Sequence, residues 1–224
     1  MNKQRPNHWR ELFAQITLKT VLPEEFWDVE LSDKPDLKKH SSGLGIEVVY
    51  ATVQKDEQLQ SYYRNFLEGK LITEVSSKGL SNFHSHFYDV IMDKDTHTIS
   101  ALKKICEPFD INIIYNAIDK KMQKLNAGLY DYSDNLSLYV QTLAYSCDLA
   151  DFSTAESILQ HITNLKYKYD ISFQEVFYDC IFVLYRLNVE SLKINKIDLS
   201  DYYDDILKQY NSIIKRNVTK HDQL

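Results

Sequence analysis

The sequence predicts an α/β fold in which helices flank a mixed central β-sheet. Apolar residues recur at helical spacing in several segments, β-branched and aromatic residues cluster in others, and the two kinds of segment alternate along the chain. Apolar residues make up 44% of the 224 positions, with only 5 glycines and 4 prolines. This composition excludes collagen-like, low-complexity and fully disordered classes.

The expected helices follow from apolar stripes with a spacing of three and four residues. The first begins near Pro6 or Asn7, because proline is favoured in a first turn, and it ends at Pro23. In this helix Trp9, Phe13 and Ile16 form the stripe. Similar patterns predict helices at 59–66, 99–105, 111–128, 155–165 and 199–216.

The expected strands are the segments rich in β-branched and aromatic residues. The strongest is 44–51, and a second at 26–31 places Trp27, Val29 and Leu31 on one face. The run 176–187 is almost continuously apolar, which fits either a central strand or a buried helix. Shorter strands are expected at 36–39, 71–75, 88–93 and 136–143.

Neither an internal repeat nor a Pro/Gly/Ser-rich linker divides the chain, so we expect a single domain over 1–224. Its core is expected at about 7–143, with a C-terminal strand and helices at 144–216 packed on it. The longest apolar run, Cys180 to Tyr185, is far shorter than the ~20 residues that span a bilayer. The N-terminus lacks an apolar signal core. We therefore expect a cytoplasmic protein without a membrane partner, and the oligomeric state stays open, a homodimer included.

Charge and cysteine content narrow the classes of function. The 26 basic and 32 acidic side chains leave a formal charge of −6, which argues against broad neutralisation of nucleic-acid phosphates. An enzyme with carboxylates in one cleft remains compatible with this balance. Cys106, Cys147 and Cys180 are widely spaced and form no CxxC pair, so a zinc ribbon is not supported. We expect them to be small buried residues in a reducing compartment.

Two carboxylates carry the candidate chemistry. Asp36 begins a short strand, and Glu47 lies eleven residues later inside an apolar strand reached through a glycine-containing hairpin. Burying a carboxylate there is unfavourable unless it is paired or binds a cation. Side chains from two paired strands can hold Mg²⁺ or Mn²⁺ together with water and a phosphate oxygen. The backbone carbonyl of Val48 is a third candidate ligand.

These residues resemble the motif of the PD-(D/E)XK nuclease-like superfamily. Pro35-Asp36 is followed by Glu47-x-Val49 on an apolar strand, and Glu11 lies on an amphipathic helix before them. Segment 117–126, with the apolar stretch 136–143, resembles uncharacterised bacterial members. The resemblance implies a restriction-endonuclease-like core and Mg²⁺- or Mn²⁺-dependent hydrolysis of phosphodiester bonds, with DNA as the partner. It further implies that Asp36 and Glu47 are metal ligands and that Glu11 is an outer ligand.

The motif lysine is replaced by Val49, so either another lysine serves the site or the site is inactive. Relative to the apolar stripe of the helix at 111–128, Lys120 projects to the opposite side, whereas Lys121 lies roughly 70° from the stripe centre. Lys121 is therefore the candidate to position the attacking water. Glu11 points roughly 150° away from the apolar stripe of its own helix, which is also typical of a solvated glutamate.

Alternative functions remain open at this stage. Val49 and the acidic balance also fit a catalytically inactive nuclease-like binding or assembly protein. A structural interaction protein without nuclease ancestry predicts that Asp36 and Glu47 lie far apart. His84-Ser85-His86 suggests a Zn²⁺ site if the two histidines share the face of a strand, but no third ligand stands at a supporting spacing.

Overall fold

The chain folds into two compact units, and the second is inserted in the sequence of the first. The computed structural model describes residues 8–51, 54–86, 88–104, 110–130, 135–142, 151–180 and 182–221. The described residues of 1–51 and 111–224 form the larger unit, called unit 1 here, and those of 52–110 form unit 2. The core expected at 7–143 thus includes parts of both. In the ranges described, no helix is long and apolar enough to cross a membrane.

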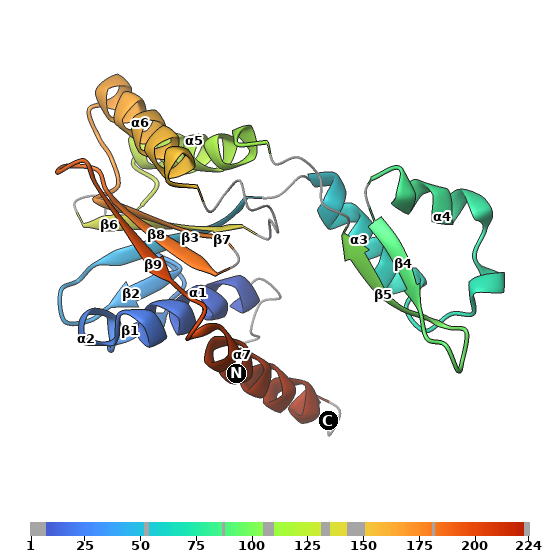
Figure 1. Ribbon diagram of the computed structural model, residues 1–224. Coiled ribbons are helices and arrows are strands. Elements are labelled where there is room, and N and C mark those ends of the chain that lie inside the picture. Colours follow the sequence, from blue (N-terminus) through green and yellow to red (C-terminus); the bar gives the residue numbers. More distant parts are fainter. Residues whose placement is uncertain are drawn as a thin grey trace. The chain divides into compact units, whose positions relative to one another are not determined.

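Unit 1 is built around a mixed seven-stranded β-sheet (Figure 1). β3 pairs with β6, and β6 with β7, in parallel, whereas the strand pairs on either side of them are antiparallel. The spatial order is β1 (Val29–Leu31), β2 (Leu37–Lys39), β3 (Gly45–Ala51), β6 (Leu136–Thr142), β7 (Glu175–Cys180), β8 (Val183–Asn188) and β9 (Lys193–Asp198).

Helices cover both faces of this sheet, so the predicted α/β class with a mixed, helix-flanked sheet is confirmed. Buried residues of α1 and α7 join Ile46, Val48 and Tyr139 in one apolar core on the first face. Helices α5 and α6 pack on each other and cover the second face (Figure 1). The helices of unit 1 are α1 (His8–Val21), α2 (Pro23–Phe26), α5 (Asn112–Asn126), α6 (Phe152–Tyr169) and α7 (Tyr203–His221).

Side chains alternate along β3, and this alternation positions the candidate site. Ile46 and Val48 are buried in the core under α1. Because successive residues of a strand point to opposite faces, Glu47 and Val49 point toward the face that α5 covers. Every residue of β6, the central neighbour of β3, is buried. The candidate site therefore lies beside an inner strand of the sheet, on the face that α5 covers.

Unit 2 has its own small core. Its elements are α3 (Gln54–Phe66), a 3₁₀ turn (Ile72–Glu74), α4 (Ser77–His84), β4 (Tyr88–Met92) and β5 (Ile99–Lys104), with β4 and β5 forming an antiparallel pair. The strand expected at 71–75 is wrong, since the chain forms the 3₁₀ turn there. The helix expected at 99–105 is also wrong: over 99–104 its apolar residues form the strand whose Ile99 packs on Phe83 and Tyr88.

Two expectations for unit 1 also require correction. The run 176–187 is neither one strand nor a helix: β7 and β8 form a hairpin in which Cys180 faces Val183. A continuous apolar run contains no sequence signal for such a reversal, because both strands are buried. The strand expected at 26–31 is limited to Val29–Leu31, and Trp27 is an exposed residue of the turn before it.

Gly45 allows the chain before β2 to approach β3 closely. A Cβ atom at this position would lie 2.6 Å from Cγ of Pro35 and 2.9 Å from Cδ1 of Leu136, far inside normal contact distances. We expect Gly45→Ala to lower the free energy of unfolding by about 1–3 kcal/mol, because a buried side chain is forced into a packed region. Urea unfolding measures the loss. Gly43→Ala adds a Cβ with no atom within 4 Å, so its effect, due to its positive φ alone, provides the comparison.

Candidate active site

Asp36 and Glu47 lie side by side because of the register between β2 and β3. Leu37 pairs with Ile46 in an antiparallel ladder, and continuing this register by one residue places Asp36 opposite Glu47. The carboxylate of Asp36 does not extend into solvent: its Oδ2 accepts a hydrogen bond of 2.7 Å from the backbone N–H of Val48. The strand hairpin thus brings the two predicted carboxylates to one place.

Lys121 of α5 joins both carboxylates. Its Nζ lies 2.6 Å from Oε2 of Glu47 and 3.8 Å from Oδ2 of Asp36. Only 8% of the Glu47 side chain and 14% of the Lys121 side chain are exposed. The structure therefore brings together three of the predicted residues, of which the hydrogen-bonded Glu47 and Lys121 are 74 positions apart in the sequence. The wide separation that a purely structural interaction protein predicts is not observed.

The electrostatics of this cluster are those of a partly dehydrated ion pair. Burial is the largest influence on Glu47 and raises its pKa, the Lys121 ammonium lowers it, and the Asp36 carboxylate raises it again. The net result is a raised pKa. Removing either partner of such a pair leaves the other charge poorly solvated, which is far more unfavourable than losing a surface ion pair.

The two valines of the motif strand lie on different faces. Val49 is half-buried on the α5 side and pairs with Val140, so an apolar group stands where the motif lysine is expected. Val48 points its side chain into the core under α1, and its backbone N–H holds Asp36. The contact observed between Val48 and the site is thus made by the amide, whereas the sequence suggested the carbonyl as a ligand.

Glu11 belongs to α1, the helix on the sheet face opposite to Glu47. It lies in the first turn of α1, and α1 packs on the sheet face of Ile46 and Val48, opposite to the face of Glu47. The neighbouring Arg10 places its guanidinium 4.0 Å from the ring centroid of Tyr50, on the same face as α1. The assignment of Glu11 as an outer ligand therefore has no support from the arrangement around Glu47.

Tyr130 is a member of the site that the sequence did not indicate. It follows α5 and the turn at Gly128. Burial is the main cause of a strongly raised pKa of its phenol, and the nearby charges of Glu47 and Asp36 raise it further. Its hydroxyl oxygen is buried, yet no hydrogen bond of normal geometry reaches it among the described residues. No sequence motif indicates this tyrosine, because its position near the carboxylates depends on how α5 packs on the sheet.

The donor set fits a hard divalent cation. Asp36 and Glu47 supply carboxylate oxygens, which are the ligands that Mg²⁺ and Mn²⁺ prefer, usually with several waters completing the coordination sphere. Over the described part of the chain, no cluster holds three or more His, Cys, Asp or Glu side chains in a metal-binding arrangement. A cation here would therefore depend on the two carboxylates and on water.

The histidine pair does not have the arrangement that a zinc site requires. His84 is the last residue of α4, so the two histidines do not share the face of a strand. Nδ1 of His84 lies 3.6 Å from Asp89, whereas Nδ1 of His86 bonds to the carbonyl of Asn82 at 2.8 Å. The condition for a zinc site, a shared strand face, is therefore not met. Of the three cysteines, Cys180 is buried as expected, and Cys106 and Cys147 lie outside the described residues.

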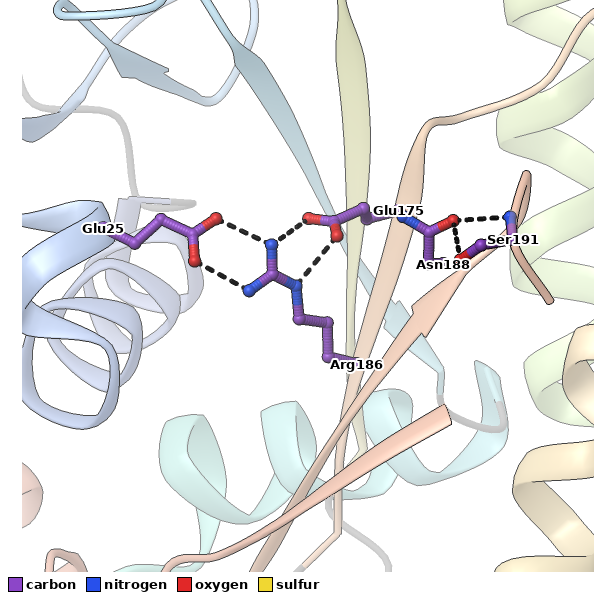
Figure 2. A network of polar contacts seen from close by, with 5 residues as sticks. All are labelled: Glu25, Glu175, Arg186, Asn188 and Ser191. Carbon is purple, nitrogen blue, oxygen red and sulfur yellow. Dashed lines mark hydrogen bonds and ion pairs between the residues drawn. The ribbon is translucent and has the colours of Figure 1, made fainter. Parts of the chain in front are cut away.

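A second polar network surrounds Arg186 on β8 (Figure 2). Its guanidinium donates to Glu25 at 2.7 Å through Nη1 and Nη2, and to Glu175 at 2.9 Å through Nε and Nη2. The network borders a pocket of about 420 Å³ that also includes Lys39 and Glu190. Because both carboxylates bond to the Arg186 guanidinium, the network connects α2 to β7 and β8.

A third polar group is buried beneath α1. Asp179 of β7 accepts hydrogen bonds from the Tyr139 hydroxyl at 2.8 Å and from the Thr142 backbone N–H at 2.7 Å. Burial raises the pKa of Asp179 to about 7, although these hydrogen bonds act in the opposite direction. Tyr139 belongs to the core on the α1 side, so this cluster is separate from Glu47. Asp179 was not predicted from the sequence, although a lone carboxylate in the apolar run 176–187 is a feature that could have indicated this buried group.

Comparison of the chain with models of known protein families, with curated proteins and with solved structures gives no match.

Proposed function

We propose that this protein hydrolyses phosphodiester bonds of DNA in a reaction that depends on Mg²⁺ or Mn²⁺. The observation that carries the proposal is the convergence of Asp36 and Glu47 on the Lys121 ammonium, on the buried central strand β3. Two carboxylates and a lysine at one place can support metal-assisted attack of water on a phosphate. The lysine comes from α5, since Val49 occupies the motif position.

The order of elements supports the same proposal. In PD-(D/E)XK nuclease-like proteins a helix precedes a hairpin that bears the PD and (D/E)xK residues, and a further helix and more sheet follow. Here α1 precedes the β2–β3 hairpin, and α5 and β6 follow it. This order agrees with a restriction-endonuclease-like core into which unit 2 is inserted in the sequence.

Each residue of the cluster has a distinct task in this reaction. A divalent cation held by Asp36 and Glu47 would polarise the phosphate and acidify a bound water. The Val48 amide fixes the orientation of the Asp36 carboxylate. Lys121, beside Glu47, would orient the attacking water and stabilise negative charge developing on the phosphate oxygens. The attacking water gives up one proton as its oxygen bonds to phosphorus, one P–O ester bond breaks, and the departing oxygen takes up a proton, so the number of protons balances.

Nicking of supercoiled plasmid DNA tests the proposal. We expect cleavage in Mg²⁺ or Mn²⁺ that EDTA stops, and we expect Asp36→Ala and Glu47→Ala to reduce it to background because each loses a metal ligand. Glu30→Ala is the matched control, since Glu30 is an exposed glutamate of β1 paired with His40. Cleavage by both carboxylate variants at the parental rate would refute the assignment.

The second candidate function is a catalytically inactive binding or assembly protein. The short Lys121–Glu47 ion pair favours it, because Lys121 engages an oxygen that a cation would use. If this second candidate is correct, calorimetry should detect no Mn²⁺ binding that depends on Asp36, so the parent and Asp36→Ala should give the same result. The plasmid should also stay supercoiled. Measurable Mn²⁺ binding lost in that variant favours the hydrolytic function.

A further inference from the structure

The hydroxyl of Tyr130 is a buried polar group close to the carboxylates of Glu47 and Asp36. Its oxygen is buried and receives or donates no hydrogen bond of normal geometry within the described residues. A buried hydroxyl without a partner is unfavourable, so such groups in native proteins commonly mark a place where a ligand or water binds. The phenol lies within reach of the Glu47 carboxylate, whose Oε2 accepts a hydrogen bond from Lys121.

The surroundings determine which kind of group the hydroxyl can bind. A tyrosine phenol carries its proton at neutral pH, so the buried hydroxyl of Tyr130 can donate a hydrogen bond. A neutral phenol is a poor ligand for Mg²⁺, which prefers carboxylates, carbonyls and water. A negatively charged oxygen that a cation and Lys121 hold next to the carboxylates can accept a charge-assisted hydrogen bond from this phenol.

We propose that the Tyr130 hydroxyl donates a hydrogen bond to a non-bridging oxygen of the scissile phosphate. This inference rests on the proposed phosphodiesterase function and adds to it a residue that contacts the substrate. Lys121 and Tyr130 would then both donate hydrogen bonds to the phosphate. Lys121 donates from a charged ammonium beside Glu47, and Tyr130, which follows the same helix, donates from a neutral phenol. The phenol is neutral, and its hydrogen bond becomes stronger as negative charge develops on the phosphate oxygen that accepts it.

Phosphorothioate substrates test this contact on the unaltered protein. Sulfur accepts hydrogen bonds poorly, and Mn²⁺ restores cleavage when the replaced oxygen contacts the metal but not when it contacts only a protein donor. We expect one diastereomer of a site-specific phosphorothioate DNA to be cleaved about 10- to 100-fold more slowly, the size expected for one hydrogen bond to a charged group, with no rescue by Mn²⁺. Absence of such an effect for both diastereomers overturns the proposal.

Tyr130→Phe provides the matching variant. We expect it to cleave normal DNA about 10- to 100-fold more slowly than the parent and to lose the Mn²⁺-insensitive sulfur effect. Tyr115→Phe is the control, because Tyr115 stacks on His161 of α6 at 4.2 Å and should cleave like the parent. A Tyr130→Phe enzyme that is slow but keeps the sulfur effect, or that matches the parental rate, refutes the contact and leaves the proposed function standing. A parent that cleaves nothing refutes both.

Discussion

Lys121→Met should lower the metal-dependent cleavage rate by about 10³-fold, a loss comparable to removing one preorganised charge-stabilising group. The same substitution should reduce the free energy of unfolding by about 3 kcal/mol, because it leaves Glu47 buried without its partner. Methionine keeps most of the lysine side-chain volume, so the change reports on the charge. Single-turnover cleavage assays and urea unfolding at pH 8 measure the two effects.

A double-mutant cycle separates the charge effect from packing. Glu47→Gln combined with Lys121→Met removes both charges, so we expect it to recover most of the lost stability but none of the activity. At pH 5 the stability loss of Lys121→Met should shrink. Burial already raises the pKa of Glu47, and without Lys121 that pKa rises further, so lowering the pH protonates the unpaired carboxyl more readily and removes its buried charge.

Lys120→Met serves as the helix control in this cycle. Lys120 is the neighbouring residue of α5, and substitutions outside the site should change the free energy of unfolding by at most about 0.5 kcal/mol. If Lys120→Met and Lys121→Met reduce cleavage and stability equally, the contact between Lys121 and Glu47 has no special role.

Asp179→Asn should remove a large pH dependence of stability. Burial raises the pKa of Asp179 to about 7 in the folded protein, whereas an aspartate of the unfolded chain titrates near 4. The folded state therefore binds the proton more tightly, and the stabilisation that the protonated group provides is lost as the pH rises from about 4 to about 7. The total change is about 4 kcal/mol in the free energy of unfolding.

Urea unfolding of the parent and Asp179→Asn at pH 4.5 and pH 7.5 measures this difference. Asparagine can still accept the Thr142 N–H and cannot ionise, so the variant should gain stability relative to the parent as the pH rises. Asp93→Asn is the control, because hydrogen bonds from Thr96 lower the pKa of this exposed carboxyl below its ordinary value near 4, so its titration should leave the pH dependence between pH 4.5 and 7.5 nearly unchanged. Equal pH dependence of the parent and Asp179→Asn would show that the buried group does not titrate in this range.

Local patterns along the chain predicted a large part of the candidate site. Asp36 and Glu47 could be paired because a short hairpin between two strands fixes which residues face each other. The angular position of Lys121 on its helix selected it over Lys120, since the apolar stripe orients α5 against the sheet. The same arithmetic placed Glu11 away from its apolar stripe, and α1 does cover the other face.

The sequence by itself determined the α/β class, most helices of unit 1, and the carboxylates on the hairpin, because these depend on periodicity over a few residues and on a short turn. Only the tertiary structure decided that the apolar run at 176–187 is a hairpin and that the apolar residues at 99–104 form a strand. It alone showed the distance between Lys121 and Glu47 and placed the Tyr130 hydroxyl near the carboxylates. Contacts between residues far apart in the chain depend on how helices pack on the sheet, which periodicity does not encode.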